Sequence, residues 1–305
     1  MTAVAAALPR RRQRTTTAVD VPPLGGGMHL VRGGLVVVFM LSLSLLLQLL
    51  VISALQQRAA QQRAYDSFRA DLAEGTAPVG AVDSSGHVLA TGSPMAYLEI
   101  PAIGLRQVVV EGTTPSTLFS GPGHRRDTPF PGQPGSSVIY GRRGAFGGPF
   151  SRVDDLDEGD VVRVTTAQGE FDYRVLGVRH EGEPVPDPPQ SDEGRLVLAT
   201  AAGRPFMPSG VLRVDAVLES DVVTATPRPV SAAALPANEQ LMASDTSTLW
   251  ALALWIQALT VATLGAVWAW HRWGRAPAWV VFFPVLLLVG LNTASEAARL
   301  MPNLL

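Results

Sequence analysis

The sequence contains no cysteine and no lysine. Without cysteine the chain cannot form a disulfide, bind a metal through thiolates or use a thiolate as a nucleophile. All 24 basic residues are arginines, set against 26 acidic residues. The resulting formal net charge of -2 gives no general argument for nucleic-acid binding, and no nucleic-acid partner is predicted. Arginine in place of lysine, beside abundant Ala, Gly and Pro, is typical of a GC-rich genome.

Charged residues are scarce, at 16% of the chain, and are nearly absent from three long apolar runs. These runs cover residues 33–55, 248–270 and 276–296. At 1.5 Å rise per residue each would form a helix of about 30 Å, the thickness of a bilayer's hydrocarbon core. We therefore predict three transmembrane helices. The first is longer than a usual signal-peptide core and no small-x-small cleavage site follows it, which favours an uncleaved anchor.

Basic and aromatic residues predict the orientation of these helices. The arginine run at residues 10–14 and Arg32 precede the first helix, and Arg272 and Arg275 lie in the short loop between the other two. Because cytoplasmic segments are enriched in arginine, this pattern predicts a multi-pass protein of the cell membrane, with the amino-terminal segment and the loop 271–275 in the cytoplasm and residues 56–247 outside the cell. All six tryptophans lie in the last two apolar runs or their loop, mostly near helix ends, where headgroups favour amphipathic rings.

The remaining segments divide by composition. Residues 1–32 show no apolar period and are predicted to be a disordered cytoplasmic tail. Residues 56–94 begin with good helix formers up to Glu74 and continue with Gly, Ser and Pro, which predicts a helical stalk and a connector. Residues 222–247 are rich in Pro, Ala, Thr and Ser and are predicted to be a linker.

Residues 95–221 carry short β-branched runs separated by turn residues, the pattern of a small all-β domain. The predicted strands are 97–100, 107–110, 136–140, 161–165, 170–178, 195–199 and 211–218. No amphipathic helical period of any length intervenes between them. The predicted fold class is therefore mainly β, an antiparallel β-barrel or sandwich outside the membrane, joined to three transmembrane α-helices.

Several short motifs in this β domain follow one another in an order that resembles the sortases, the cell-wall cysteine transpeptidases of Gram-positive bacteria. The motifs are Ile100–Gly104, Glu111-Gly112, Gly121–His124, Pro131–Gly135, Gly148–Phe150, Leu156–Asp160 and the strand Leu196–Ala201. Each motif alone is weakly specific, and their shared order and spacing carry the resemblance. The resemblance covers about 125 residues, the β domain only, and implies a sortase-like β-barrel.

The resemblance also shows which catalytic groups are missing. Sortases use a cysteine nucleophile, a histidine that protonates the leaving amine and an arginine that steadies the oxyanion or the substrate. The matching positions here hold Ala201, Arg142 and Val211. A methyl group cannot attack a peptide bond, and a guanidinium stays protonated at working pH and cannot shuttle a proton. Arg213, two residues after Val211 and on the same strand face, is the candidate replacement for the arginine.

The chain is therefore expected to be a degenerate, pseudosortase-like protein without an intact catalytic set. We expect a membrane-anchored scaffold or peptide-binding partner in cell-surface protein assembly. Its candidate groove comprises Thr200, Ala201, Arg142 and Arg213, and its candidate ligand is a cell-surface protein or sorting-signal peptide.

Two alternatives from other classes stay open. The first is a transpeptidase or peptidase with a non-cysteine nucleophile, for which Thr200 with His124 is the candidate pair. The second is a structural subunit of a membrane complex, in which the three membrane helices carry the interface.

No metal or cofactor site is predicted. The acidic segment from Asp154 to Asp160 supplies oxygen ligands of the kind that calcium prefers, but it lacks the EF-hand order and is typical of a solvated turn. The other histidines show no metal-ligand spacing. Glu296 and Arg299, near the end of the last apolar run, are expected to form an ion pair rather than an ion path.

Overall fold

The computed structural model describes residues 26–83 and 86–305. The chain divides into two compact units, Met1–Phe39 and Met40–Leu305, and the contacts described below lie within the second. Most of the tail predicted at residues 1–32 lies outside the described residues. The first helix, α1, spans Gly26–Leu47 and so begins earlier than the predicted start at residue 33. Met28, Leu30 and Val31 add apolar residues before the predicted start, interrupted by His29 and Arg32.

The helix continues beyond α1 without a break. A π-helical turn, η1, covers Gln48–Ile52, and α2 covers Ser53–Glu74. The helix ends at Gly75, whose left-handed φ of 69° is the usual conformation of a helix-terminating glycine. The stalk predicted at this point is not free-standing, because the Gln61 side chain pairs with the main chain of Val108. Its amide donates to Val108 O over 3.0 Å, and Val108 N–H donates back over 2.7 Å.

The second and third predicted membrane helices form a hairpin. They are α3, Leu249–Trp273, and α4, Arg275–Arg299, and they join at Gly274. Three helices are thus long and apolar enough to cross a membrane among the described residues. The α4 helix packs closely on the end of α1, since a Cβ added at Gly290 would lie only 2.7 Å from Ser44 Oγ. Most of the tryptophan rings remain exposed on this hairpin, as lipid-facing rings would be.

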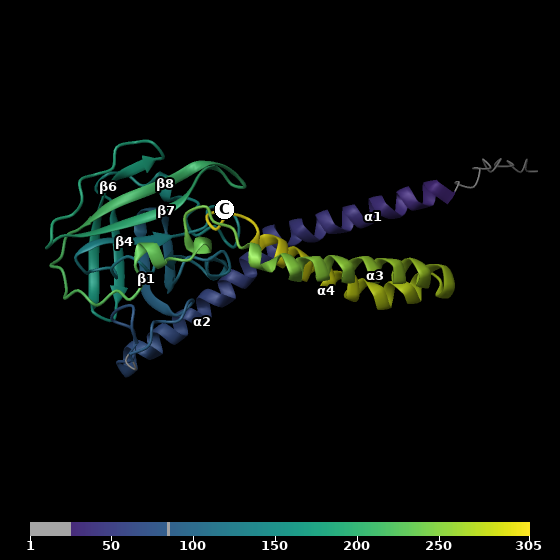
Figure 1. Ribbon diagram of the computed structural model, residues 1–305, viewed down its shortest axis with the longest axis horizontal. Helices are drawn as coiled ribbons and strands as arrows, with labels where there is room; N and C mark the ends of the chain where they lie inside the picture. Colours follow the sequence, from purple (N-terminus) through teal and green to yellow (C-terminus); the bar gives the residue numbers. More distant parts are fainter. Residues whose placement is uncertain (1–25, 84–85) are drawn as a thin grey trace, which may run out of the picture. The chain divides into compact units, whose positions relative to one another are not determined.

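The β domain is a closed eight-stranded barrel (Figure 1). Its strand order is β1-β2-β3-β4-β7-β8-β6-β5. The strands are β1 Pro94–Ile100, β2 Leu105–Glu111, β3 Gly123–His124, β4 Gly135–Tyr140, β5 Val161–Thr166, β6 Gly169–His180, β7 Gly194–Arg204 and β8 Met207–Leu218. The sequence predicted a barrel or a sandwich, and the structure is the barrel.

Two features of the barrel differ from the sequence prediction. The strand β3 was not predicted, because two residues that include a glycine give no alternating pattern. The pairs β2–β3 and β4–β7 are parallel, whereas the other neighbouring pairs are antiparallel. Periodicity reveals which residues face inward but not the direction of the neighbouring strand, so a purely antiparallel barrel was the simpler expectation.

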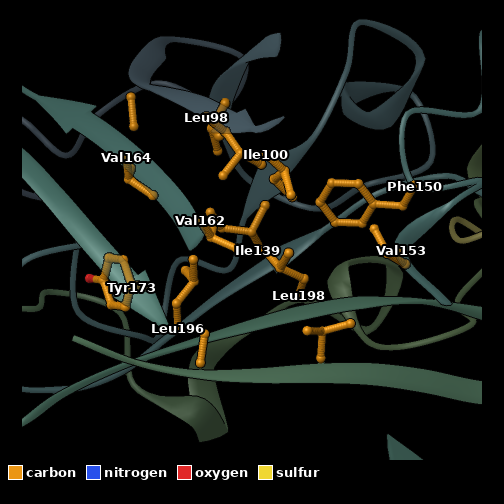
Figure 2. Close-up of a cluster of buried hydrophobic side chains, with 14 of the residues drawn as sticks. Leu98, Ile100, Ile139, Phe150, Val153, Val162, Val164, Tyr173, Leu196 and Leu198 are labelled. Carbon is orange, nitrogen blue, oxygen red and sulfur yellow. The ribbon is translucent and has the colours of Figure 1, made fainter. Parts of the chain in front are cut away.

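The barrel core consists of the inward-facing side chains of the strands (Figure 2). Ile139 of β4 lies in register with Leu198 of β7, and both are fully buried. Phe150 and Val153, from the segment after β4, close one side of this cluster. Alternation along β7 sends Leu196 and Leu198 into the core and the intervening residues outward. The strand predicted from the Arg195–Ala199 pattern thus sits centrally between β4 and β8.

Candidate functional site

The candidate site lies on the outer face of β7. Ala199 and Ala201 point outward and lie in register with Arg213 and Val211 of β8. Thr200 lies between them and pairs with Leu212, a member of the barrel core. It therefore points to the opposite face of the sheet from Ala201. Thr200 is fully buried and its hydroxyl has no hydrogen-bond partner among the described residues, so this side chain does not line the outer face.

The loop after β4 brings Arg142 next to this strand. Gly141 N–H donates to Ala199 O over 3.0 Å, which fixes the loop to β7. Only glycine fits here, because a Cβ at Gly141 would lie 2.4 Å from the Phe150 ring. The Arg142 side chain turns inward beside two aromatic rings, with its Cζ 4.9 Å from the Phe119 centroid and 5.2 Å from the Phe146 centroid. It is the largest fully buried side chain of the described chain.

The contacts of Arg142 are those of a buried side chain that supports the fold. Its Nη2 donates to Pro115 O over 3.1 Å, while Nε and Nη1 have no partner among the described residues. Burial lowers the pKa of Arg142 to about 9, so the guanidinium stays charged at neutral pH. Cation–π contacts with both rings offset part of its desolvation. The sequence predicted that Arg142 lines the floor of the groove. The Arg142 side chain is instead buried beneath that surface.

The outer face of β7 is instead an apolar surface, which we call the outer patch. Its fully or nearly fully buried members are Leu118, Tyr140, Ala199, Ala201 and Val211.

The chain's own segment Asn303–Leu305, which we call the covering segment, packs directly on this patch through Leu304 and Leu305. Leu304 is fully buried and Leu305 is 8% exposed. Ala201 thus lies in the same buried apolar cluster as two leucine side chains from a distant part of the chain.

Main-chain hydrogen bonds hold the covering segment on the barrel. Arg143 N–H donates to Leu304 O over 2.9 Å, and Ala145 N–H donates to Leu305 O over 3.1 Å. Both donors belong to the loop that follows the family's histidine position. The covering segment therefore satisfies backbone groups of this loop that would otherwise need another acceptor or water.

Asn303 anchors the start of the covering segment. Its side-chain amide donates to Thr113 O and to Gln240 O, each over 2.9 Å, and its main-chain N–H donates to Ala243 O over 2.8 Å. Asn303 is fully buried. One side chain therefore ties the covering segment both to the barrel and to the segment 222–247. Burial of the two leucines contributes about 3–6 kcal/mol, before the entropy of ordering the segment is subtracted.

The segment predicted as a linker, residues 222–247, packs partly on the same side of the barrel. Leu235 and Glu239 are buried, and Leu241 and Met242 border the outer patch. Glu239 pairs with Arg126 over 3.2 Å. Burial raises the pKa of the Glu239 carboxyl, and the nearby Arg126 opposes that shift. A shallow pocket remains open beside the outer patch, lined by Arg125, Tyr140, Gln240 and Leu241.

The structure separates the other candidate residues. Arg213 is half-buried beside Ala199 on the outer face, two positions from Val211. His124 is fully buried on β3, where Nδ1 lies 2.9 Å from Glu111 Oε2 and Nε2 lies 3.0 Å from Pro129 O. Its ring is also 3.1 Å from the Thr128 hydroxyl, and no hydrogen bond joins it to Thr200 among the described residues. The Thr200–His124 pair considered as an alternative nucleophile and base is not assembled.

The acidic segment is used in local contacts. Asp154 pairs with Arg143 over 2.6 Å, and Asp155 pairs with Arg152 over 3.0 Å. Asp160 accepts the main-chain N–H of Asp157. Among the described residues no group of three or more His, Asp or Glu side chains is placed to hold a metal ion.

On α4, Arg299 and Glu296 form the expected ion pair over 3.5 Å.

Sequence reasoning did not single out the residues that close this site. The covering segment lies about a hundred positions after Ala201, and Phe119 and Phe146 come from two separate loops. The one available signal was the Leu304–Leu305 pair, which follows Pro302 and stands outside the third apolar run.

Comparison with known proteins agrees with this geometry. Residues 98–205 match the sortase domain family. Sortase D of Bacillus subtilis (strain 168) is 36% identical over 86 residues, which are 28% of this chain and 42% of that protein. The chain thus matches less than half the length of this curated relative. The match to the family includes Arg142 and Ala201, whereas Val211, Arg213 and the covering segment lie beyond it.

Solved sortases are similar to the chain at low sequence identity. A Clostridium perfringens sortase D5 transpeptidase is 22% identical, with a TM-score of 0.45, and the alignment covers 53% of this chain and 99% of that one. A Clostridium perfringens sortase C, solved with the C-terminal cell wall sorting motif, is 22% identical, with a TM-score of 0.40 and coverages of 53% and 89%.

Residues 98–205 of the chain thus carry a sortase domain. The candidate positions predicted from the sequence lie on β7 (Ala201), on β8 (Val211) and on the loop after β4 (Arg142).

Proposed function

We propose that the chain is a membrane-anchored, non-catalytic sortase-domain protein that acts as a scaffold or peptide-binding partner in cell-surface protein assembly. One observation carries the proposal: the outer patch contains Ala201 and Val211, the two residues that the sequence resemblance assigns to the family's nucleophile and arginine. A methyl and an isopropyl group offer neither an attacking atom nor a hydrogen-bond donor. The outer patch can hold a peptide by packing but cannot break it.

Two of the polar candidates, Thr200 and Arg142, support the same interpretation. Thr200 points into the barrel, and Arg142 is enclosed beside Phe119 and Phe146. Removing a nucleophile or a base from a catalytic unit lowers the rate by many orders of magnitude, because such groups act together. By the resemblance, this chain has Ala201 and Arg142 at the two positions, and the hydroxyl that the outer patch does contain, that of Tyr140, makes no hydrogen bond to a histidine or a carboxylate among the described residues.

We propose that the three apolar helices anchor the barrel outside the cell membrane. The arginine run at residues 10–14 and the loop arginines Arg272 and Arg275 would then lie in the cytoplasm. In this arrangement the barrel stands close to the membrane, since α2 continues the first helix and docks on β2. Such a barrel would meet cell-surface proteins as they leave the membrane.

Turnover of a sorting-signal peptide by the full chain in detergent tests the proposal. The unmodified protein is expected to release no product, measured by chromatography, while it binds a labelled sorting-signal peptide weakly and reversibly. Product release that Thr200→Ala abolishes would overturn the proposal and favour the peptidase alternative.

The combined change Ala201→Cys with Arg142→His is the matched gain-of-function control. Activity in this variant alone would show that the sortase framework around the outer patch is preserved. It would also show that the two substitutions, rather than a disrupted barrel, remove the chemistry.

A further inference from the structure

The outer patch already has an occupant, and that occupant belongs to the same chain. Leu304 and Leu305 cover Ala201 and Val211, and the two leucine carbonyls accept hydrogen bonds from the loop after β4. The covering segment thus uses both elements by which a peptide is held on a sheet surface, namely side chains in an apolar site and main-chain pairing with an adjacent loop.

We propose that the outer patch is a peptide-binding site whose resident ligand is the covering segment, and that a peptide from another protein binds only after this segment has left. The proposal rests on the non-catalytic function above and adds the nature of the ligand. The expected ligand is an extended segment with two adjacent large aliphatic side chains and free main-chain carbonyls.

The first argument comes from the small apolar residues at and beside the positions that the resemblance assigns to the family's catalytic groups. Small and apolar residues at Ala199, Ala201 and Val211 leave a floor into which two leucines fit with almost no exposure. An arginine at the Val211 position would place a long charged side chain among those leucines, at a desolvation cost. The substitutions that remove the chemistry are therefore the same ones that create the apolar site.

The polar contacts give the second argument, because they fix the direction of the bound segment. Asn303 bridges Thr113 of the barrel and Gln240 of the segment before α3. The carbonyls of Leu304 and Leu305 then run along Arg143–Ala145 in order. A ligand with a different spacing would leave these buried donors unpaired, which disfavours it.

The third argument is that the covering segment is part of the same chain as the site. The covering segment follows α4 directly, and Asp245 N–H donates to Arg299 O over 3.1 Å, which fixes the end of that helix beside the segment before α3. A tethered occupant has a high effective concentration, so a free peptide competes poorly while the segment is seated. The apparent affinity for an external peptide is reduced by the fraction of molecules in which the site is open.

Binding of a fluorescent peptide with the sequence of residues 300–305 to the full chain in detergent tests the proposal. The unmodified protein is expected to bind it weakly. The combined change Leu304→Asp with Leu305→Asp, which expels the segment from the apolar floor, is expected to bind it at least about tenfold more tightly. Adding Ala201→Arg to that variant is expected to remove the gain by filling the floor. Val185→Asp, an exposed substitution, is the control and is expected to bind like the unmodified protein.

Hydrogen exchange of the Arg143 and Ala145 amides provides a readout that needs no destabilising variant. Both amides are expected to be protected in the unmodified protein, to exchange at least about tenfold faster in the double leucine variant, and to regain protection when the peptide is added. Fast exchange in the unmodified protein, or a freed segment without improved peptide binding, would overturn the proposal. Turnover of a sorting-signal peptide would overturn only the non-catalytic function and would leave these binding results standing.

Discussion

The two faces of β7 show how differently one strand can be constrained. Its inner face carries Leu196 and Leu198, which pack in the barrel core, and its outer face carries Ala199 and Ala201. The inner residues fit the sortase strand pattern, whereas on the outer face the sequence resemblance predicts the nucleophile position at Ala201. The comparison teaches that the fold depends on the inner face alone. The outer face could change chemistry because its residues contribute little to the core.

The largest loss of stability is expected for a substitution on the inner face of β7. Leu198→Ala leaves a cavity beside Ile139 and is expected to cost about 3 kcal/mol, or a fall in Tm of about 6–12 °C. Thermal unfolding of the full chain in detergent measures it. Leu176→Ala, at a partly exposed position of β6, is the matched control and should change Tm by much less. Equal losses in the two variants would contradict the assignment of the inner face.

The next effect concerns the anchor of the covering segment. Asn303→Asp replaces an amide that donates to two carbonyls with a carboxylate that repels them, at a cost of about 2–3 kcal/mol. We expect the Arg143 amide to exchange faster while the barrel stays folded. Gln190→Glu makes the same chemical change at an exposed position and should have no effect. Unchanged protection in the Asn303 variant would show that this side chain does not hold the segment.

A pair of tyrosines compares the two faces directly. The Tyr173 hydroxyl accepts the Gly132 N–H over 2.7 Å inside the barrel, whereas the Tyr140 hydroxyl, at the outer patch, lies near Arg125 without a hydrogen bond of good geometry among the described residues. Tyr173→Phe is expected to cost about 1–2 kcal/mol through the buried N–H left unpaired, and Tyr140→Phe close to nothing. Denaturant unfolding monitored by circular dichroism separates the two. The reverse order would contradict the comparison.

A smaller effect is expected at Arg142. Burial lowers its pKa to about 9, and two of its nitrogens lack a partner among the described residues. Arg142→Met keeps the volume and removes the buried charge, so we expect stability to be unchanged or to increase by about 1 kcal/mol. Arg142→Ala, which leaves a cavity, should lower Tm. A marked loss of stability in the methionine variant would indicate that the charge itself is needed.

The smallest expected effect is a pH dependence at Glu239. Burial raises its pKa in the folded state, with Arg126 opposing, so its contribution to stability is present at pH values below the unfolded pKa and is lost as pH rises through the folded one. Glu239→Gln cannot ionise and can still accept the Arg126 hydrogen bond. Its Tm advantage over the unmodified protein should therefore grow as pH rises through that range and then level off. A gap that shrinks with rising pH would contradict this sign.

The sequence predicted the barrel well because its causes are local. Alternation and turn residues located seven of its strands, and the apolar runs located the helices that became α3 and α4. Order and spacing of short motifs also predicted the sortase domain that the family match covers. These features depend on neighbours in sequence, which a single chain displays.

The rest of the site could not be predicted because its causes are non-local. The burial of Arg142 depends on Phe119 and Phe146, which come from separate loops. The covering segment reaches Ala201 from about a hundred residues away and has no periodic pattern of its own. Only the three-dimensional structure showed that the outer face, expected to be an open and cationic groove, is apolar and occupied.

Intact-protein mass spectrometry tests the central claim most directly. The full chain is incubated with a sorting-signal peptide, quenched in acid and weighed, with Ala201→Cys plus Arg142→His beside it. The account predicts that the unmodified chain keeps its own mass at every time point, because the outer patch holds no activated nucleophile. A mass increase equal to the acyl fragment on the unmodified chain would contradict it.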